Sequence, residues 1–396
     1  MTSAKRWLLP DGVEEILPDE AHRLESLRRQ MLDLYKSWGY QLVITPMIEF
    51  LDSLLVGSSQ DLDLHTFKIT DQLSGRMMGV RADITPQAAR IDAHCLNHEG
   101  PVRLCYADSV LHTKPRGIMT SRVPIRVGAE LFGHAGVECD IELICLMHET
   151  LRRAELSDLT IVLGHVGIFR TLVHEAKLAP DTERDLFDAM QRKAYDEIDA
   201  VLSAKVEDEK LSGMLRKLSR LSGDESILPE AVAAFADAPD SVKKEMQDLV
   251  AIAEGVKRRI PKVELCFDLC ELRGYAYHTG IVFAAYTPNY GRAVAKGGRY
   301  DHIGEVFGRS RPASGFDSDL KTLAKLTRGS YNRPNTILAP AGDDEALLKV
   351  VSALREAGEV VITNLTDETL DSGKLAELNC DRQLVLRSGQ WEVETI

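Results

Sequence analysis

The segment from Arg122 to Gly133 carries the residue pattern best suited to binding chemistry. Apolar and polar residues alternate along it, as expected for a β-strand with one face toward the core. Arg126 and Glu130 fall on the other face, and Gly128 between them is expected to leave open space for a ligand. Such a pair could bind a small charged molecule or form an ordinary ion pair on a solvated face. The strand alone leaves both alternatives open.

A second group of residues has the types that bind metal ions. His94, Cys95 and His98 lie close together, and Cys266 and Cys270 follow much later in the chain. This spacing fits no common zinc pattern, and the same residues suit a helix end with a buried thiol. We therefore predict no metal. The sequence also contains no Walker loop and no dinucleotide fingerprint, so no cofactor is predicted.

The composition is that of an acidic globular chain. Its 396 residues include 48 Lys and Arg against 61 Asp and Glu, a formal net charge of −13, and 44% of them are hydrophobic. This charge disfavours nucleic acid, because binding to a phosphate backbone needs a clustered basic surface. No apolar run reaches the roughly 18 to 20 residues of a membrane span, and no signal segment precedes Pro10. Seven scattered cysteines indicate reduced thiols, and we expect a cytoplasmic protein.

Several elements must position these residues. Apolar residues at steps of three and four predict an amphipathic helix from Asp19 to Trp38, followed by a strand from Tyr40 to Pro46. Residues Phe67 to Val80 have the pattern of a hairpin. Residues from roughly 168 to 260 are helix-rich and indicate an inserted helical subdomain, after which strands return between Val263 and Tyr286.

The C-terminal part of the chain has the pattern of a separate small domain. The stretch from Gly329 to Pro334 has the composition of a linker. A strand, a helix and two strands are predicted after it, at Ile337–Pro340, Glu345–Ala357, Val360–Thr363 and Gln383–Arg387. We therefore expect a main domain over residues 1–328, with the insertion at about 168–260, and a small α/β domain over residues 329–396.

The order of these elements resembles the class II aminoacyl-tRNA synthetase catalytic domain, and histidyl-tRNA synthetase in particular, over roughly residues 10–326. The motifs that carry the resemblance are Gly39–Pro46, similar to the first class motif; Val80–Pro86, similar to the loop that holds the amino acid ammonium; and Leu272–Gly280 and Ala295–Asp301, similar to two signatures of the histidyl enzyme. The resemblance implies an α+β fold, with an antiparallel sheet flanked by helices, a helical insertion and a small C-terminal α/β domain. It also implies a dimer formed through the first motif.

The resemblance further implies a candidate histidine-binding site. Its members are Asp83, Thr85, Arg126, Glu130, Arg273 and Tyr277. Asp83 offers a carboxylate for the ligand ammonium, and Glu130 offers one for an imidazole N–H. Arg273 and Tyr277 supply a cation and a hydroxyl for polar contacts. The alternative is a buried salt-bridge network without a ligand.

The synthetase pattern is only partly kept in this pocket. Arg126 stands where the pattern has a glutamine, and Ala276 and His278 replace an aspartate and a tyrosine. These replacements leave open a pocket that is altered or silent.

The ATP site of the synthetase pattern lacks its cationic anchors. His112 stands at the position of the arginine that binds the ATP α-phosphate, and Lys114 at that of a glutamate. In the third motif, Lys321 replaces a carboxylate and Thr322 replaces the second ATP-binding arginine. Arginine is permanently charged and binds phosphate through paired hydrogen bonds, so its loss is expected to abolish amino-acid activation.

A synthetase-like body with a disabled ATP site resembles the ATP phosphoribosyltransferase regulatory subunit family. The segments Arg81–Gln87, Gly128–Gly133 and Ala313–Leu320 carry this resemblance. It implies a non-catalytic subunit, dimeric within a hetero-octamer, that joins a short-form catalytic subunit in the first step of histidine biosynthesis and mediates feedback by L-histidine. No tRNA partner is expected, because the tail is acidic and shorter than a typical anticodon-binding domain. A true histidyl-tRNA synthetase and a different histidine-binding paralogue stay open as alternatives.

Overall fold

The computed structural model describes residues 7–55, 60–115, 117, 120–272, 274–275, 277–288, 290–327, 329, 331, 333–366 and 370–396. The chain divides into two compact units. The first comprises Met1–Ile16 and Leu24–Gly329, and the second comprises Leu17–Arg23 and Ser330–Ile396. Within the described ranges, no helix has the length and apolar character that crossing a membrane requires.

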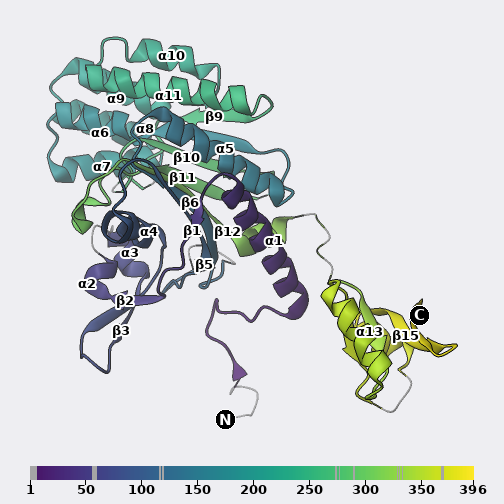
Figure 1. Ribbon diagram of the computed structural model, residues 1–396. Coiled ribbons are helices and arrows are strands. Elements are labelled where there is room, and N and C mark those ends of the chain that lie inside the picture. Colours follow the sequence, from purple (N-terminus) through teal and green to yellow (C-terminus); the bar gives the residue numbers. More distant parts are fainter. Residues whose placement is uncertain are drawn as a thin grey trace. The chain divides into compact units, whose positions relative to one another are not determined.

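The first unit is built around a nine-stranded sheet in the described part of the chain (Figure 1). Neighbouring strands run antiparallel except in the pairs β1–β5 and β7–β9. In sheet order the strands are β1 (Gln41–Leu42), β5 (Val102–Ser109), β6 (Ile125–Phe132), β12 (Ala313–Asp319), β11 (Ala295–Arg299), β10 (Ile281–Tyr286), β7 (Thr160–His165), β9 (Glu264–Asp268) and β8 (Ser222–Asp224). This arrangement confirms the predicted α+β fold with a mainly antiparallel sheet.

Helices α1 (Pro18–Ser37) and α5 (Val137–Arg153) pack against one face of this sheet. On α1, Tyr35 meets the edge of the Phe316 ring of β12, with ring centroids 6.2 Å apart. Its hydroxyl also accepts a hydrogen bond of 3.4 Å from Thr150 of α5. The apolar face predicted for α1 is therefore buried against the sheet and a second helix.

The helix-rich segment expected near residues 168–260 is present. Its helices gather at the β7–β9 end of the sheet, and the short strand β8 lies among them in sequence (Figure 1). The helices are α6 (Val166–Glu175), α7 (Pro180–Gln191), α8 (Tyr195–Lys205), α9 (Glu209–Arg220), α10 (Ile227–Ala234) and α11 (Asp240–Arg259).

A small three-stranded sheet and several short helices complete the first unit. The predicted hairpin is confirmed, because Phe67 pairs with Val80 and Thr70 with Met77. The strand predicted from Tyr40 to Pro46 is shorter than expected and is limited to β1. The remaining elements are β2 (Ile48–Phe50), β3 (Phe67–Thr70), β4 (Met77–Val80), α2 (Leu51–Leu54), α3 (Gln60–His65), α4 (Thr85–Arg90), a π-helical turn (Ile91–Leu96), a 3₁₀ turn (Glu305–Phe307) and α12 (Leu320–Leu326).

The second unit is a four-stranded sheet with two helices. Its sheet order is β14 (Val360–Thr363), β13 (Thr336–Ala339), β15 (Cys380–Arg387) and β16 (Gln390–Thr395), and its helices are α13 (Glu345–Glu356) and α14 (Ser372–Glu377). The core contains Ile337, Leu347, Val361 and Leu384, against which Trp391 packs. The strand–helix–strand–strand prediction missed α14 and β16, two six-residue elements.

Candidate functional site

A cavity of about 280 Å³ opens on the face of the main sheet opposite α1 and α5. Its lining includes Val282, Gly315 and Glu130. These residues lie in one row across β10, β12 and β6, and Gly298 of β11 pairs with both Val282 and Gly315 in the same row. A Cβ at Gly315 would lie 1.5 Å from a carboxylate oxygen of Glu130. Glycine at this position therefore lets the Glu130 side chain extend over the neighbouring strand.

Of the two alternatives for the Arg126–Glu130 face, the solvated ion pair is wrong. Both faces of β6 are covered over most of its length, and Glu130 is 1% exposed. The space expected beside Gly128 is also filled, because a Cβ there would lie 2.7 Å from the Tyr106 hydroxyl and 2.5 Å from the Phe316 carbonyl oxygen. Alternation along the strand identified the two faces correctly but could not show what covers each of them.

Glu130 lies at the centre of a ring of hydroxyl donors. Its Oε1 accepts hydrogen bonds from Thr85 Oγ1 at 3.0 Å and from Tyr106 at 2.9 Å, and its Oε2 accepts one from Tyr300. Burial raises the pKa of Glu130 to about 8, although these three donors lower it in part. This carboxyl group can hold a proton at neutral pH and release it to a neutral base, which then becomes its cationic partner.

The Tyr277 hydroxyl is a candidate hydrogen-bond donor to a ligand. Its hydroxyl is buried and has no hydrogen-bond partner within the described part of the chain. The ring stacks on Tyr300 with centroids 5.0 Å apart and lies edge-on to His278 at 5.2 Å. Burial, followed by the nearby charges of Glu130 and Asp83, raises the pKa of Tyr277 well above 10. The hydroxyl therefore stays protonated and can donate a hydrogen bond to a ligand.

The other charged residues of the cavity lining are mainly acidic. Asp83, Glu271 and Asp317 line it together with Lys296. One oxygen of Asp83 accepts the Thr85 backbone N–H at 3.1 Å, which holds that carboxylate at the cavity edge. An excess of carboxylates favours a ligand that carries at least one positive charge.

Arg126 does not line the cavity but lies behind one of its walls. Its Nη1 lies 3.3 Å from an oxygen of Asp317, and each side chain is 14% exposed. Arg126 therefore fixes Asp317 and partly offsets its charge. The structure brings five predicted residues to one place, with Asp83, Thr85, Glu130 and Tyr277 on the cavity wall and Arg126 behind it. Arg273, and the replaced position Ala276, lie outside the described residues.

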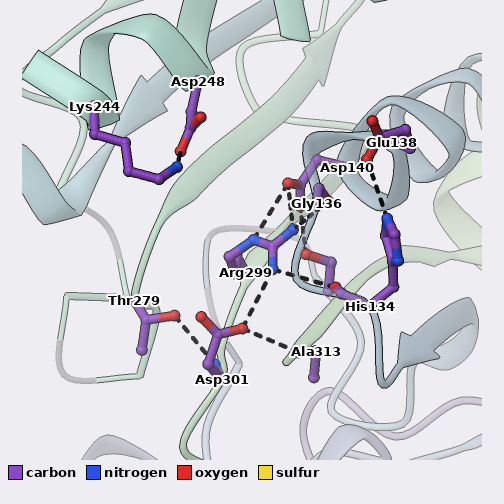
Figure 2. Close-up of polar contacts among 11 residues, drawn as sticks. His134, Gly136, Glu138, Asp140, Lys244, Asp248, Thr279, Arg299, Asp301 and Ala313 are labelled. Atoms are coloured by element: carbon purple, nitrogen blue, oxygen red, sulfur yellow. Dashed lines mark hydrogen bonds and ion pairs between the residues drawn. The ribbon is translucent and has the colours of Figure 1, made fainter. Parts of the chain in front are cut away.

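The Tyr300 hydroxyl donates to Glu130, and an ion pair on the opposite face of the sheet helps to position it. Figure 2 shows this ion pair, between Arg299 and Asp140. The neighbouring Arg299 binds Asp140 of α5 through Nε at 3.2 Å and Nη2 at 2.6 Å. Ser314 donates to the other oxygen of the same carboxylate. Because successive residues of a strand point to opposite faces, anchoring Arg299 to α5 directs Tyr300 into the site.

Sequence reasoning missed Tyr106, Tyr300 and Asp317 as members of this site. Tyr300 lies within the Ala295–Asp301 signature, and Tyr106 pairs directly with Gly128 across β5 and β6. A search for hydroxyl groups opposite small residues on paired strands could have found both tyrosines.

The four positions at which the synthetase pattern has lost its ATP contacts now make contacts within the chain or face solvent. His112 is buried, and its Nε2 lies 3.0 Å from the Ala82 carbonyl oxygen. Lys321 Nζ lies 3.2 Å from a Glu14 carboxylate oxygen, and Thr322 donates to Asp319 at 2.9 Å. Lys114 is exposed.

No group of three His, Cys, Asp or Glu side chains in the described ranges is arranged to bind a metal ion. His94 and Cys95 lie on the π-helical turn, where Cys95 is exposed, whereas Cys270 is buried elsewhere.

Comparison with known proteins identifies the family to which this chain is related. A family model described as histidyl-tRNA synthetase matches residues 12–323, and one described as ATP phosphoribosyltransferase subunit HisZ C-terminal domain matches residues 334–394. The ATP phosphoribosyltransferase regulatory subunit of Ectopseudomonas mendocina is 53% identical over 99% of both chains, and that of Stutzerimonas stutzeri is 54% identical over the same share.

Solved structures show the same fold at lower identity. A crystal structure from Bacillus halodurans, described as an ATP phosphoribosyltransferase regulatory subunit/histidyl-tRNA synthetase, has a TM-score of 0.82 at 24% identity and covers 95% of this chain and 97% of that one. Histidyl-tRNA synthetase from Nostoc sp. PCC 7120 has a TM-score of 0.77 at 18% identity, covering 98% of this chain and 97% of that one. The main body thus has the histidyl-tRNA synthetase fold, and the chain belongs to the ATP phosphoribosyltransferase regulatory subunit family.

Proposed function

We propose that this chain binds L-histidine in the cavity around Glu130 and passes the feedback signal to a short-form ATP phosphoribosyltransferase catalytic subunit. Family membership identifies it as a regulatory subunit without catalytic activity of its own. The observation that carries the histidine proposal is the buried Tyr277 hydroxyl, which has no partner within the described chain and lies beside the Glu130 carboxyl group in a cavity of suitable size.

The chemistry of the cavity matches the three polar groups of histidine. In our proposal the ammonium binds the Asp83 carboxylate, and the imidazole lies between Glu130 and the Tyr277 hydroxyl. Lys296 lines the cavity and Arg126 pairs with Asp317 of its lining, and one of these two cations would bind the ligand carboxylate. The sequence-based assignment also includes Arg273 for this role.

The same geometry argues against amino-acid activation. Lys321 and Thr322 are engaged by Glu14 and Asp319, and His112 lies against a backbone carbonyl group. None of these three positions carries an arginine, so the paired phosphate contacts that the synthetase pattern makes from them are lost. We therefore propose no adenylate chemistry and no tRNA partner.

The assembly is also part of this proposal. Dimerisation through the segment Gly39–Pro46 is supported by exposed apolar side chains at Leu42 and Ile44. We propose that such dimers join catalytic subunits in a cytoplasmic hetero-octamer, which agrees with the free cysteines of the described chain. Histidine binding is assigned to the main domain, residues 1–328, and no role is assigned to residues 329–396.

The test is the rate of phosphoribosyl-ATP formation by the catalytic subunit of the same organism, with and without this chain and with and without L-histidine. We expect the chain to change the rate and histidine to inhibit the mixture. If the chain changes the rate but histidine inhibits the catalytic subunit equally with and without it, regulation stands and the histidine site is refuted. No effect of the chain under any condition would refute the regulatory role.

A further inference from the structure

The loop that carries Asp83 and Thr85 is held at both ends by buried polar side chains. This loop, residues 82–86, is called the ligand loop below. Arg81 precedes it and Gln87 follows it, and these two residues are 1% and 2% exposed. Neither belongs to the described lining of the histidine cavity. Both extend instead toward a neighbouring segment of the chain.

Arg81 binds the chain just before Pro46. Its Nη1 donates to the Thr45 carbonyl oxygen at 2.6 Å and to the Thr45 hydroxyl at 2.7 Å. Its Nε donates to the Ser109 carbonyl oxygen at 2.8 Å, and its Nη2 forms an ion pair of 2.7 Å with Asp108. A planar guanidinium group with this many partners has a fixed orientation. The start of the ligand loop is therefore tied to Thr45 and to the end of β5.

Gln87 binds the next carbonyl group along the same segment. Its Nε2 donates to the Pro46 carbonyl oxygen at 2.8 Å and to a carboxylate oxygen of Glu49 at 2.6 Å. Its Oε1 is buried and has no hydrogen-bond partner within the described chain, so both contacts depend on Nε2. Arg90, three residues further along α4, binds the two oxygens of Glu49 at 2.6 and 2.7 Å. The end of the ligand loop is therefore tied to Pro46 and to β2.

The segment that these two side chains bind also carries exposed apolar groups. Four large apolar side chains there are between 47% and 80% exposed, namely Leu42, Ile44, Met47 and Ile48. Thr45, which lies between them, is buried. Apolar groups gathered in this way mark a protein–protein interface, and in the proposed function a second copy of this chain covers them. One short segment thus presents an interface to solvent and binds the ligand loop from within.

The backbone of this segment is weakly constrained by the main sheet. β1 is a two-residue strand at the edge of that sheet. Beyond it, Val43 donates its N–H to the Cys105 carbonyl oxygen, and Met47 accepts the Arg81 N–H, each at 2.9 Å. A short edge strand with few contacts has low local stability. Burial of Ile44 against a second copy would therefore fix residues 43–47 more firmly.

We propose that Arg81 and Gln87 are positioning residues through which histidine binding and the association of two copies favour each other. The inference rests on the proposed histidine site and the proposed dimer interface. When a second copy fixes residues 43–47, the two carbonyl groups that accept from Arg81 and Gln87 are already in place. The ligand loop then loses less conformational freedom when histidine binds. By linkage, each bound histidine strengthens the dimer by the same factor.

Sedimentation velocity and isothermal titration of the full-length chain test this inference. Ile44→Lys should weaken the dimer, because it places a charge in the apolar surface, and the monomeric variant should bind L-histidine about tenfold more weakly than the dimeric wild type. Saturating L-histidine should lower the dimer dissociation constant of Ile44→Lys by about a hundredfold, about tenfold for each of two sites. Val232→Lys changes an exposed apolar residue of α10 and should dimerise and bind histidine as the wild type does.

Gln87→Met, made in the Ile44→Lys background, tests the proposed side chain. Methionine has a similar length but cannot donate to Pro46 or Glu49, and the change is milder than one at Arg81, which makes more contacts. Histidine should strengthen the dimer of this variant by less than about fivefold. A purely structural role of Gln87 would lower stability and leave the effect of histidine on the dimer unchanged. Gln247→Met, at an exposed position of α11, is the matched control, and thermal unfolding checks that each variant is folded.

The possible outcomes separate this inference from the proposed function. An Ile44→Lys monomer that binds histidine within twofold of the wild type would overturn the inference, and so would an Ile44→Lys chain that dimerises as tightly as the wild type. A full effect of histidine on the dimer of Gln87→Met would overturn the role of Gln87. If the wild type binds no histidine, the proposed histidine site fails together with this inference, whereas normal binding without coupling refutes this inference alone.

Discussion

Replacing Glu130 by glutamine should weaken histidine binding by about tenfold to a hundredfold. Glutamine has nearly the same shape, and its one oxygen can still accept hydrogen bonds from Thr85 and Tyr106, whereas its NH2 group would face the Tyr300 hydroxyl. What it lacks is the negative charge that we assign to the imidazole contact. A hydrogen bond to a charged group contributes about 1.5 to 3 kcal/mol, and about 1.4 kcal/mol corresponds to a factor of ten in affinity.

The pH dependence of the wild-type chain gives a sharper form of the same prediction. Between about pH 6.5 and 8, the free Glu130 holds a proton because its pKa is about 8, and a free imidazole, with an ordinary pKa near 6.5, is largely neutral. The acidic cavity favours an imidazolium–carboxylate pair, which contains the same single proton. Binding then neither takes up nor releases a proton, so the affinity should stay nearly constant across this range.

Isothermal titration with L-histidine at several pH values measures both effects. Glu138→Gln is the matched control, because it removes an exposed carboxylate of α5 outside the cavity and should bind histidine normally. A tenfold rise in wild-type affinity from pH 7 to pH 8 would show that the bound imidazole is neutral and would refute the proton-sharing argument. An affinity of Glu130→Gln within twofold of the wild type would refute the role of Glu130.

Three further predictions follow from the same contacts. Folding raises the pKa of Glu130 from 4.5 to about 8, so between these values the folded chain binds more protons than the unfolded chain. The stability of the ligand-free chain should therefore fall by about 4 to 5 kcal/mol from pH 4.5 to pH 8 through this group. Urea unfolding should show a smaller fall in Glu130→Gln. Tyr277→Phe should weaken histidine binding by about twofold to tenfold, measured by titration, without lowering the urea midpoint, because its buried hydroxyl has no partner to lose within the described chain. Asp140→Asn should destabilise the chain by about 2 to 3 kcal/mol in urea unfolding, because the buried Arg299 guanidinium group then keeps only the longer 3.5 Å contact with the Asp301 carboxylate.

The local patterns of the sequence predicted several elements well. The amphipathic spacing from Asp19 to Trp38 corresponds to α1, and the turn residues between Phe67 and Val80 correspond to the β3–β4 hairpin. Both depend on contacts between residues close in sequence, or on one apolar face, so the chain alone contains the information. The tail was predicted less completely, because α14 and β16 are short and depend on packing within the small unit.

The candidate site was predicted in part for a related reason. Motif similarity located Asp83, Thr85, Glu130 and Tyr277, and the structure places them on one cavity wall. It did not locate the tyrosines that donate to Glu130, because no local pattern relates residues 106, 130 and 300. Only the pairing of β5, β6 and β12 and the loop after β11 bring these residues together.

The sequence by itself determined which residues could carry charge toward a ligand, the α+β fold, and the loss of the ATP-binding arginines. The tertiary structure alone decided that both faces of β6 are covered and that hydroxyl groups surround Glu130. It also showed that Glu14, near the start of the first unit, forms an ion pair with Lys321, near its end. The physical reason is that alternation and spacing assign a side chain to a face, whereas burial, pKa and ion pairing depend on what packs against that face.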